Sequence, residues 1–473
     1  MLTDLNNSQE INNNFSNFDV AVIGAGAAGI TIAKKIAFKG KKVALIEAGG
    51  YDYSEESQKI YSAKTNGDYY YDLDVARLRY FGGTTNHWGG MCRPFEEEDF
   101  NREYLDQAFK WPINNQDINF YLKEACEILE IPFVFYDETL KNSNIKRINF
   151  QFSDPPVRFN EKYFDELVKN PLIHVFLNSN LVDLNFNSDE ISGAKIKSYT
   201  DKNATINAKK FVFALGGIEN SRYLLWFRKK YGKRFMSDTQ SLGRYWMEHP
   251  HFVLGRIILN KLKVKETYLT LTAEAQKKHN ILNCGFRIEL NTVSDVKTMI
   301  REILCLAPKL GKSLLNLANK NLMCGGRFLA AWEQAPNYEN CITLDTNLLD
   351  RFGIPKPVLN WRKREIDRKT LMKSIEELNS WLLSINGGRV QIDEWLINNK
   401  DYPNYDEVAG YHHMGGTRMH KNVRYGVVDA KCKVYGSNNL YMAGSSVFTT
   451  GGHNNPTLPI IQLALRLANH LST

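Results

Sequence analysis

The 473-residue sequence lacks several features that would direct it to other classes of protein. It has no window of about 18 apolar residues, so we expect no transmembrane segment. Residues 1–17 are rich in Asn and Ser and have no apolar run, which argues against a secretory signal and predicts a flexible tail. The net charge of +8 includes no basic block, so no nucleic-acid partner is indicated.

Cysteine is scarce and scattered, and no C-x-x-C pair occurs among the seven residues. The spacing therefore indicates neither a zinc site nor a disulfide framework. We expect free thiols in a reducing compartment, and hence a cytoplasmic protein. The positions concerned are Cys92, Cys126, Cys284, Cys305, Cys324, Cys341 and Cys432.

Two further absences exclude classes of enzyme. No G-x-S-x-G elbow surrounds Ser445 and Ser446, so serine hydrolysis has no support. His249, His251 and His453 could suggest a metal, but no carboxylate cluster accompanies them, and we expect no metal site.

The sequence does contain a complete dinucleotide-binding unit over residues 18–50. An apolar strand leads into G-x-G-x-x-G at Gly24, Gly26 and Gly29, followed by a helix. The first glycine allows a sharp turn, the second lets a pyrophosphate approach, and the third lets the helix pack closely on the strand. A second strand, Val43–Ile46, ends at Glu47, where a ribose hydroxyl needs an acceptor.

Beyond this unit, the sequence predicts an α/β protein with a second domain inserted into the first. Strands are expected at 173–180, 181–186, 194–198 and 208–215, and helices at 116–131, 158–168 and 367–383. Helices broken at Pro308 and Gly311 are expected over 294–323. Residues 251–292 alternate in polarity, as antiparallel strands do. We therefore predict a discontinuous nucleotide-binding domain at 18–250 and 406–473, a substrate domain at 251–405, and a tail at 1–17.

Several ordered motifs resemble the glucose–methanol–choline (GMC) family of flavoprotein oxidoreductases over nearly the whole chain. The family resemblance implies bound FAD, a Rossmann-like FAD-binding domain of the glutathione-reductase type, an α+β substrate domain built on an antiparallel sheet, and oxidation of a CH–OH group. The motifs are VIGAGAAG with Glu47, RLRYFGGTTNHWGG, FVFALGGIENSRYLL, LGRYWMEHP, EQAPN, YHHMGGTRM and AGSSVFTTGGHNNPTLPIIQLALRLANHL.

The resemblance also implies the catalytic residues. His412, by its spacing to Gly415 and Met419, matches the catalytic histidine, which would accept the hydroxyl proton. Asn455 matches the second active-site position, where its amide would hold the substrate oxygen. His413 is the neighbour with which His412 could be confused.

The resemblance further implies the residues that contact FAD. In some members, a histidine at the place of His87 is joined covalently to the flavin ring. The N-terminus of the last helix, after Asn454, would stabilise negative charge on reduced flavin. The expected cofactor-binding residues are Gly24, Gly26, Gly29, Glu47, Gly83, Asn86, His87, Val182, Gly216, Gly444, Ser445, Asn455, Pro456 and Thr457.

Three functions remain open at this point. The leading interpretation is an FAD-dependent dehydrogenase or oxidase acting on a sugar, polyol or related hydroxyl compound. The alternatives are a redox-neutral isomerase or mutase and an FAD-binding subunit of an electron-transfer complex. Neither the substrate nor the electron acceptor, whether oxygen, quinone or a redox protein, follows from the sequence. Because only one dinucleotide fingerprint is present, we expect no consumption of nicotinamide.

Overall fold

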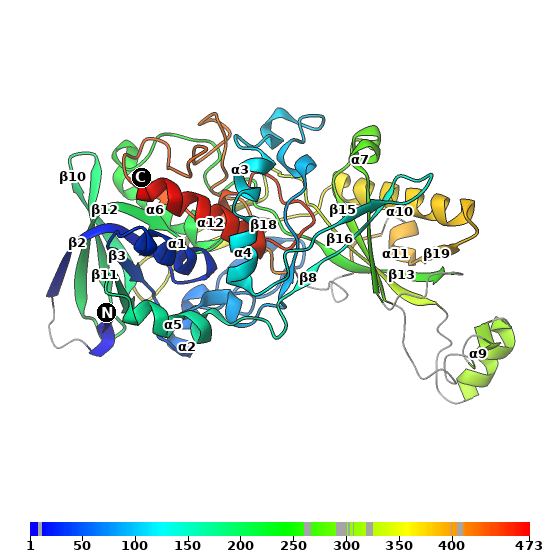
Figure 1. Cartoon of the computed structure of the whole chain (residues 1–473), viewed down its shortest axis with the longest axis horizontal. Helices are drawn as coiled ribbons and strands as arrows, with labels where there is room; N and C mark the ends of the chain where they lie inside the picture. The colour runs from blue at the N-terminus through cyan, green and yellow to red at the C-terminus, as the bar shows by residue number, and fades with distance from the viewer. Residues whose placement is uncertain are drawn as a thin grey trace.

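Two large β-sheets organise the chain, one toward each end of the molecule in Figure 1. The computed structural model describes residues 1–7, 12–259, 266–289, 300, 303–305, 307–317, 325–398, 400–403 and 410–473. The glycine-rich turn follows a strand of the first sheet, and the second sheet contains the predicted antiparallel strands.

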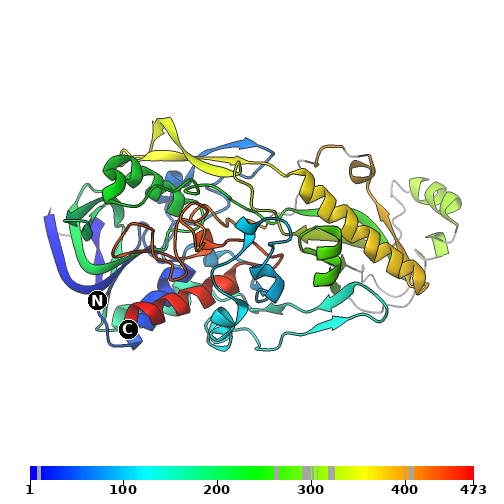
Figure 2. The ribbon, with the colours of Figure 1, turned by 90° about the horizontal axis from the view of Figure 1, so that it is seen from above.

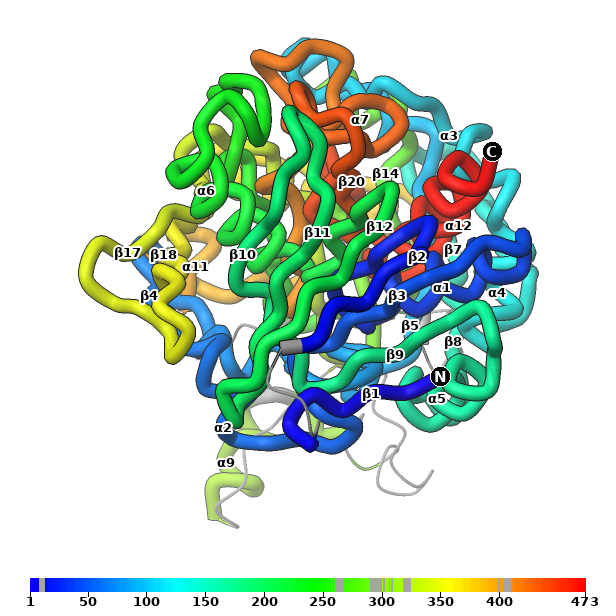
Figure 3. Tube along the Cα trace, turned by 90° about the vertical axis from the view of Figure 1, so that its left-hand side faces the viewer, coloured from blue at the N-terminus to red at the C-terminus, as the bar shows by residue number. Residues whose placement is uncertain are grey.

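The first sheet has eight strands, in the order β1-β9-β3-β2-β12-β11-β10, with β20 paired to β12. Strands β2, β3, β9 and β1 run parallel to their neighbours, whereas β10, β11 and β12 form an antiparallel meander (Figure 3). Its strands are β1 (Leu2–Asp4), β2 (Asn12–Ile23), β3 (Val43–Ile46), β9 (Ile173–Leu177), β10 (Asn180–Asn187), β11 (Glu190–Lys197), β12 (Asn203–Phe213) and β20 (Leu440–Met442).

Helices cover this sheet because its central strands are apolar on both faces. Val22 and Ile23, which are consecutive in β2 and so face opposite sides, are both almost fully buried, as expected for a strand between two layers. Helix α1 (Ala27–Phe38) connects β2 to β3, and the last helix, α12 (Thr457–Ser472), lies beside it (Figure 1). The other helices of this half are α2 (Glu55–Gln58), α3 (Asn115–Asn119), α4 (Leu122–Leu129), α5 (Phe159–Lys169) and α6 (Glu219–Tyr231).

The second large sheet has seven strands in the order β19-β13-β16-β15-β14-β7-β6, all antiparallel to their neighbours. The long helix α10 (Glu365–Ser384) packs on it (Figure 2). Its strands are β6 (Asp137–Thr139), β7 (Ile145–Ile148), β13 (His251–Leu259), β14 (Glu266–Leu271), β15 (Cys284–Glu289), β16 (Gly326–Trp332) and β19 (Gly388–Ile392). Further helices here are α7 (Ala273–His279), α9 (Pro308–Leu317) and α11 (Glu394–Ile397).

Two small sheets complete the fold. One joins β17 (Cys341–Leu349), β18 (Pro355–Trp361) and β4 (Lys64–Gly67), and the other joins β5 (Met91–Cys92) and β8 (Gln151–Phe152). Helix α9 continues through Gly311, so the predicted break at that glycine is wrong; the rest of 294–323 lies mostly outside the described residues.

The N-terminus is not the flexible tail that its composition predicts. Strand β1 pairs in parallel with β9, and β2 already begins at Asn12. The amino group of Met1 donates hydrogen bonds to the carbonyls of Val168 and Ile173, at 2.6 and 2.9 Å. An edge position in a sheet orders this polar sequence through its backbone, which composition alone does not reveal.

The predicted domain boundaries need a second correction. Residues 137–148 were expected in the FAD-binding domain, yet they form β6 and β7 of the antiparallel sheet. Tyr268 of β14 pairs with Ile148 of β7, so the second sheet is completed by a segment about 120 residues earlier in the chain. Such long-range pairing leaves no local signal in the sequence. The predicted return point at 406 lies outside the described residues.

The cysteines agree with the expectation of free thiols at five positions. Cys92, Cys126, Cys284, Cys341 and Cys432 are free and buried. Cys305 is disulfide-bonded, so the expectation is wrong there, because pairing depends on proximity in space and not on spacing in the sequence. Among the helices that the structure describes, none has the length and apolar content needed to cross a membrane.

Candidate active site

A cavity of about 700 Å³ extends from the glycine-rich turn to the antiparallel sheet. Gly24 and Gly26 line one side of it, and Tyr268 of β14 and Phe286 of β15 line the other. The last described segments of the chain, including His412 and Asn455, reach the same cavity. The two sheets therefore meet at one site.

The three motif glycines have three different local structures. Gly24 has φ +104°, and a Cβ there would lie 2.4 Å from the Ala214 carbonyl oxygen. A Cβ on Gly29 would lie 1.8 Å from the Gly24 oxygen, so the helix packs directly on the turn. Around Gly26 nothing lies within 4 Å of the missing Cβ. The turn is thus tight on the protein side and open toward the cavity, as a pyrophosphate site requires.

Two other glycines open the same wall from distant segments. Gly216 follows β12 with φ +89°, and Gly444 follows β20 with φ +96°. Neither would have an atom within 4 Å of an added Cβ, and both line the cavity. Backbone groups at three strand ends can therefore approach one elongated ligand closely.

The Glu47 carboxylate closes the turn from the end of β3. Its Oε2 accepts from the backbone N–H of Ala25 and its Oε1 from that of Gly49, both at 2.9 Å. Burial raises the pKa of Glu47, although these hydrogen bonds and Arg79 oppose that effect. Each carboxylate oxygen keeps a further lone pair, so the side chain can also accept from a ribose hydroxyl at the cavity wall.

The loop with His87 lies over the glycine turn. A Cβ on Gly83 would come within 3.2 Å of the Gly26 Cα. Arg158 fixes the loop by donating to the carbonyls of Thr85 and Trp88, at 3.2 and 3.0 Å. His87 is exposed to the cavity, and burial, followed by the charge of Arg158, lowers its pKa.

His412 and His413 have different surroundings, although they are adjacent in the chain. His412 lines the cavity, and its Nδ1 lies 2.8 Å from the Nδ1 of His249. His413 also reaches the cavity wall, but its Nε2 lies 2.9 Å from the Tyr70 hydroxyl. Burial lowers both pKa values, to about 3 for His413 and well below the ordinary value for His412. Both imidazoles are therefore neutral near pH 7.

The buried carboxylate of Glu248 holds His412 and His249 in place. Glu248 Oε1 accepts from the backbone N–H of His412 at 2.7 Å and from that of His249 at 2.8 Å. Its Oε2 accepts from the Tyr70 hydroxyl at 2.5 Å. Since a carboxylate accepts several hydrogen bonds at once, Glu248 connects the segment before β13 to the C-terminal motif.

His453 faces the cavity from the loop before α12. Both of its ring nitrogens are buried and have no hydrogen-bond partner among the described residues. Burial lowers its pKa to about 3, whereas the charge of Glu96 acts in the opposite direction. A Cβ on Gly285 would lie 2.7 Å from the His453 Cδ2, so the absence of a side chain at this position of β15 leaves room for the ring.

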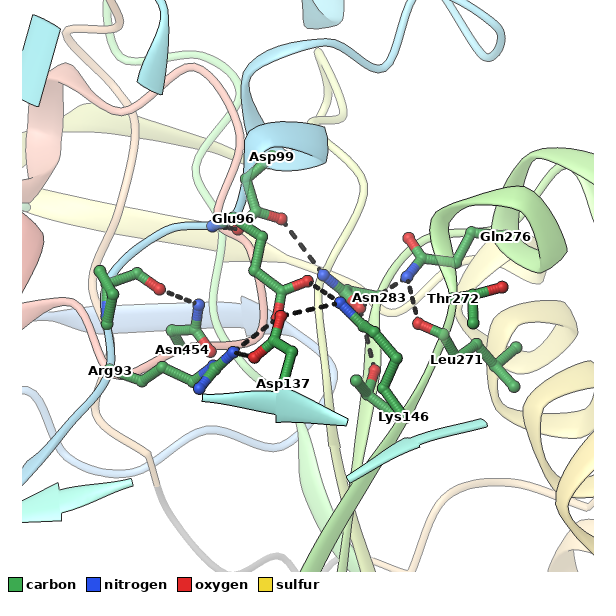
Figure 4. A network of polar contacts seen from close by, with 12 residues as sticks. Arg93, Glu96, Asp99, Asp137, Lys146, Leu271, Thr272, Gln276, Asn283 and Asn454 are labelled. Atoms are coloured by element: carbon green, nitrogen blue, oxygen red, sulfur yellow. Dashed lines mark hydrogen bonds and ion pairs between the residues drawn. The ribbon is translucent and has the colours of Figure 1, made fainter. Parts of the chain in front are cut away.

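A network of charged and amide groups lies beside that loop (Figure 4). Lys146 of β7 lies 2.6 Å from a carboxylate oxygen of Glu96, and Asn283 donates to Asp99 at 3.2 Å. Both bonds join the segment after β5 to the antiparallel sheet. Burial raises the pKa of Glu96, but the positive charges of Lys146 and Arg93 outweigh that effect and hold it below its ordinary value, so the carboxylate stays ionised.

The same segment also holds the C-terminal loop. Asn454 donates to the Pro94 carbonyl at 2.6 Å, as Figure 4 shows, and the Thr450 hydroxyl donates to the Asp99 carbonyl. The loop that carries His453 and Asn455 is thereby tied to the segment after β5 and, through it, to the antiparallel sheet.

Most of the residues predicted from the sequence line this cavity. Three do not: Gly29, which packs α1 on the turn; Asn86; and Val182. Asn86 donates to the Phe81 carbonyl at 2.8 Å and so shapes its own loop. Ser179 and Leu181 line the cavity instead of Val182, because side chains alternate along β10. The predicted residues at the cavity wall are Gly24, Gly26, Glu47, Gly83, His87, Gly216, His412, Gly444, Ser445, Asn455, Pro456 and Thr457.

Sequence reasoning did not assign a role to five cavity residues: His249, His251, Tyr268, Arg287 and His453. His249 and His453 lie in motifs that resemble the GMC family, so their place in those motifs could have indicated a position at the cavity. Tyr268 and Arg287 face the cavity only because β14 and β15 pair in this register. Within the described ranges, no three His, Cys, Asp or Glu side chains are grouped to hold a metal ion.

Comparison with known proteins agrees with this geometry. Residues 336–464 match the family model described as GMC oxidoreductase, and residues 19–58 match the one described as FAD binding domain. A 2-methyl-1,2-propanediol dehydrogenase from Mycolicibacterium austroafricanum is 22% identical, covering 96% of this chain and 95% of that protein. The fructose dehydrogenase large subunit from Gluconobacter japonicus is 20% identical, covering 95% and 97%.

A solved structure shows the same fold. The pyridoxine 4-oxidase from Mesorbium loti has a TM-score of 0.60 at 13% identity, covering 96% of this chain and 99% of that one. The glycine turn at residues 24–29, the motif with His412 and the start of the last helix fall within the matched regions. The chain is therefore an FAD-dependent oxidoreductase whose C-terminal part matches the GMC oxidoreductase family.

Proposed function

We propose that this chain oxidises a CH–OH group of a small alcohol, a diol, a polyol or a sugar to a carbonyl group. The names of the two relatives, a propanediol dehydrogenase and a fructose dehydrogenase subunit, support this substrate class. They differ in the size of the substrate they name, so the class is defined by its hydroxyl group.

One observation carries the proposal: a neutral imidazole shares the cavity with the nucleotide cradle. His412 uses Nδ1 in its contact with His249, and no partner for its Nε2 is found among the described residues. That nitrogen can therefore accept a hydroxyl proton from a substrate in the cavity. His413, whose Nε2 is engaged by Tyr70, is the poorer candidate.

The chain's own groups divide the work as follows. His412 takes the proton from the hydroxyl oxygen, and the Asn455 amide holds that oxygen in place. Bound FAD supplies the acceptor for the hydride that leaves the carbinol carbon. Breaking the O–H and C–H bonds together leaves a C=O double bond, so protons and electrons balance.

The residues at the other side of the cavity fit FAD. Gly26, Gly216 and Gly444 leave open space at the ends of three strands, and Glu47 can accept from the ribose. Helix α12 begins at Thr457 beside the cavity, and its N-terminus carries positive partial charge. That charge favours electron density on the flavin and hence its reduction.

Steady-state turnover with an artificial dye acceptor tests the proposal. The purified holoenzyme is given a panel of diols, polyols and sugars, and a hydrazine reagent traps any carbonyl product. We expect dye reduction and carbonyl formation in equal amounts for at least one substrate. Isomerised product without dye reduction would favour a redox-neutral flavoprotein, and inactivity of the lone chain would favour a subunit of an electron-transfer complex.

A further inference from the structure

The contact between His249 and His412 joins the same type of nitrogen on two rings. Their Nδ1 atoms lie 2.8 Å apart, and the ring planes are nearly perpendicular, at 85°. Burial holds the pKa of His249 at about 4 and that of His412 well below its ordinary value, so both rings are neutral. At that distance one Nδ1 must carry a hydrogen and the other must offer its lone pair.

The surroundings of His249 decide which ring donates. Its Nε2 is buried, and an ideal Cβ on Gly451 would lie 3.2 Å from it. Although this nitrogen makes no well-aligned hydrogen bond, backbone contacts with Gly451 and Gly452 raise the ring's pKa against the effect of burial. Because the Nδ1 of His249 faces His412 and Gly451 lies beside its Nε2, these backbone contacts fall at Nε2, and carbonyl acceptors there place the hydrogen of neutral His249 on Nε2.

We infer that His249 is a positioning residue that sets the tautomer of His412. Its Nδ1 lone pair accepts the Nδ1–H of His412, which leaves the His412 Nε2 without a hydrogen and facing the cavity. This inference rests on the proposed function, in which that nitrogen accepts the hydroxyl proton. When the proton arrives, the same contact stabilises the imidazolium, much as a buried carboxylate does for the histidine of a serine protease.

Among the residues that the structure describes, no other group competes for this role at the His412 ring. The Glu248 carboxylate bonds backbone N–H groups and Tyr70, and His251 and His413 act on His412 only through unfavourable charge when protonated. A neutral acceptor also has a chemical advantage. It fixes the tautomer without raising the pKa of His412 as strongly as a carboxylate would, so the base remains unprotonated.

Two substitutions at one position separate this role from packing. Asn places an amide oxygen where the Nδ1 of histidine lies, whereas Leu fills similar space without an acceptor. We expect His249→Leu to lower the rate constant of flavin reduction by about 100-fold, with FAD content and apparent substrate affinity little changed. We expect His249→Asn to recover the rate to within about 10-fold of wild type. Equal losses in both variants would overturn the inference.

The tautomer itself gives a readout that does not depend on activity. Nitrogen NMR of the holoenzyme with ¹⁵N-labelled histidine distinguishes a protonated from an unprotonated ring nitrogen, and His412→Gln identifies the His412 signals. We expect His412 to carry its hydrogen on Nδ1 in wild type and on Nε2 in a sizeable fraction of His249→Leu. Wild-type His412 protonated on Nε2 would contradict the inference even if neither His249 variant folded.

Failure of the inference is distinguishable from failure of the proposed function. If His412 is the base but His249 only packs, His412→Ala loses activity while His249→Leu retains it. If His412 is not the base, His412→Ala itself retains activity.

Discussion

The two sides of the cavity are built in opposite ways. The nucleotide side works through backbone groups and missing side chains: residues 18–50 supply its turn, and Gly216 and Gly444 add open backbone from distant segments. The catalytic side is assembled from segments that are far apart in the sequence, near His249, Tyr268, His412 and Asn455. It works through buried neutral imidazoles, whose pKa values are lowered by the protein around them.

This difference indicates that binding of FAD and proton transfer are separable. The glycine turn is formed within residues 24–29, and Gly24 packs against the Ala214 carbonyl, which follows β12 of the same sheet. The catalytic imidazoles depend on Glu248, on the loop before α12 and on the network in Figure 4, which all cross between sheets. Changes on one side should therefore leave the function of the other largely intact.

The largest effect on rate is expected from His412→Ala. Loss of the proton acceptor should lower the rate constant of flavin reduction by about 100- to 10,000-fold, with FAD still bound. Stopped-flow absorbance measures the rate, and the spectrum after denaturation measures the FAD. His413→Gln is the matched control, since its contact is with Tyr70. A His412→Ala rate within about two-fold of wild type would reject the assignment.

Gly26→Leu should prevent FAD binding without altering the catalytic side. The added side chain enters the open space where a pyrophosphate would lie, so FAD content should fall strongly while the apoprotein keeps its melting temperature. Gly29→Ala is the contrasting variant: its Cβ would collide with the Gly24 oxygen, and the apoprotein itself should lose about 1–3 kcal/mol of stability. Full FAD content in Gly26→Leu would contradict the role of the cradle.

Asn455→Ala should have an intermediate effect. Removing the amide takes away positioning of the substrate oxygen but leaves the proton acceptor, so we expect about a 10-fold lower reduction rate. Asn455→Asp is a useful comparison, because it keeps the shape but adds a charge beside α12. A loss as large as that of His412→Ala would assign Asn455 a more direct part.

Substitution of His87 tests whether this residue is joined covalently to the flavin ring. Its ring is exposed to the cavity and its pKa is lowered, so the unprotonated nitrogen needed for attachment to the flavin ring is available. We expect yellow colour to stay with the acid-precipitated wild-type protein and to leave with the supernatant in His87→Ala. Free FAD in the supernatant of wild type would rule out the bond.

Lowering the pH from 7.5 to 6.5 should have the smallest effect on the rate constant of flavin reduction. Because burial lowers the pKa of His412, the neutral base persists below pH 6.5, and the rate should fall only when pH drops through the lowered value. The reduction rate constant should therefore change by less than about 1.2-fold between pH 7.5 and pH 6.5, whereas an ordinary imidazole pKa of about 6.5 would lower it about 1.8-fold. A half-maximal rate near pH 6.5 would show instead an imidazole with an ordinary pKa.

The sequence predicted the glycine turn in detail, because its spacing lies within one short stretch, whereas Asn86 and Val182, which were expected to contact FAD, do not line the cavity. Gly24, Gly26 and Gly29 have the turn, the opening and the close packing that their spacing predicts. The catalytic side was predicted only at His412 and Asn455, through the family resemblance. The contact with His249 depends on how β13 and the C-terminal motif meet, and composition wrongly predicted a flexible tail where β1 pairs with β9.

Anaerobic reduction of the bound flavin tests the central claim most directly. The purified yellow protein is mixed without oxygen, dye or nicotinamide with a diol, a polyol or fructose, and the flavin absorbance is followed. The account predicts that a substrate bleaches the flavin stoichiometrically, forms one carbonyl product per FAD, and does so far more slowly in His412→Ala. A flavin that light reduces but no hydroxyl compound bleaches, or oxidation that proceeds only with added NAD(P), would contradict it.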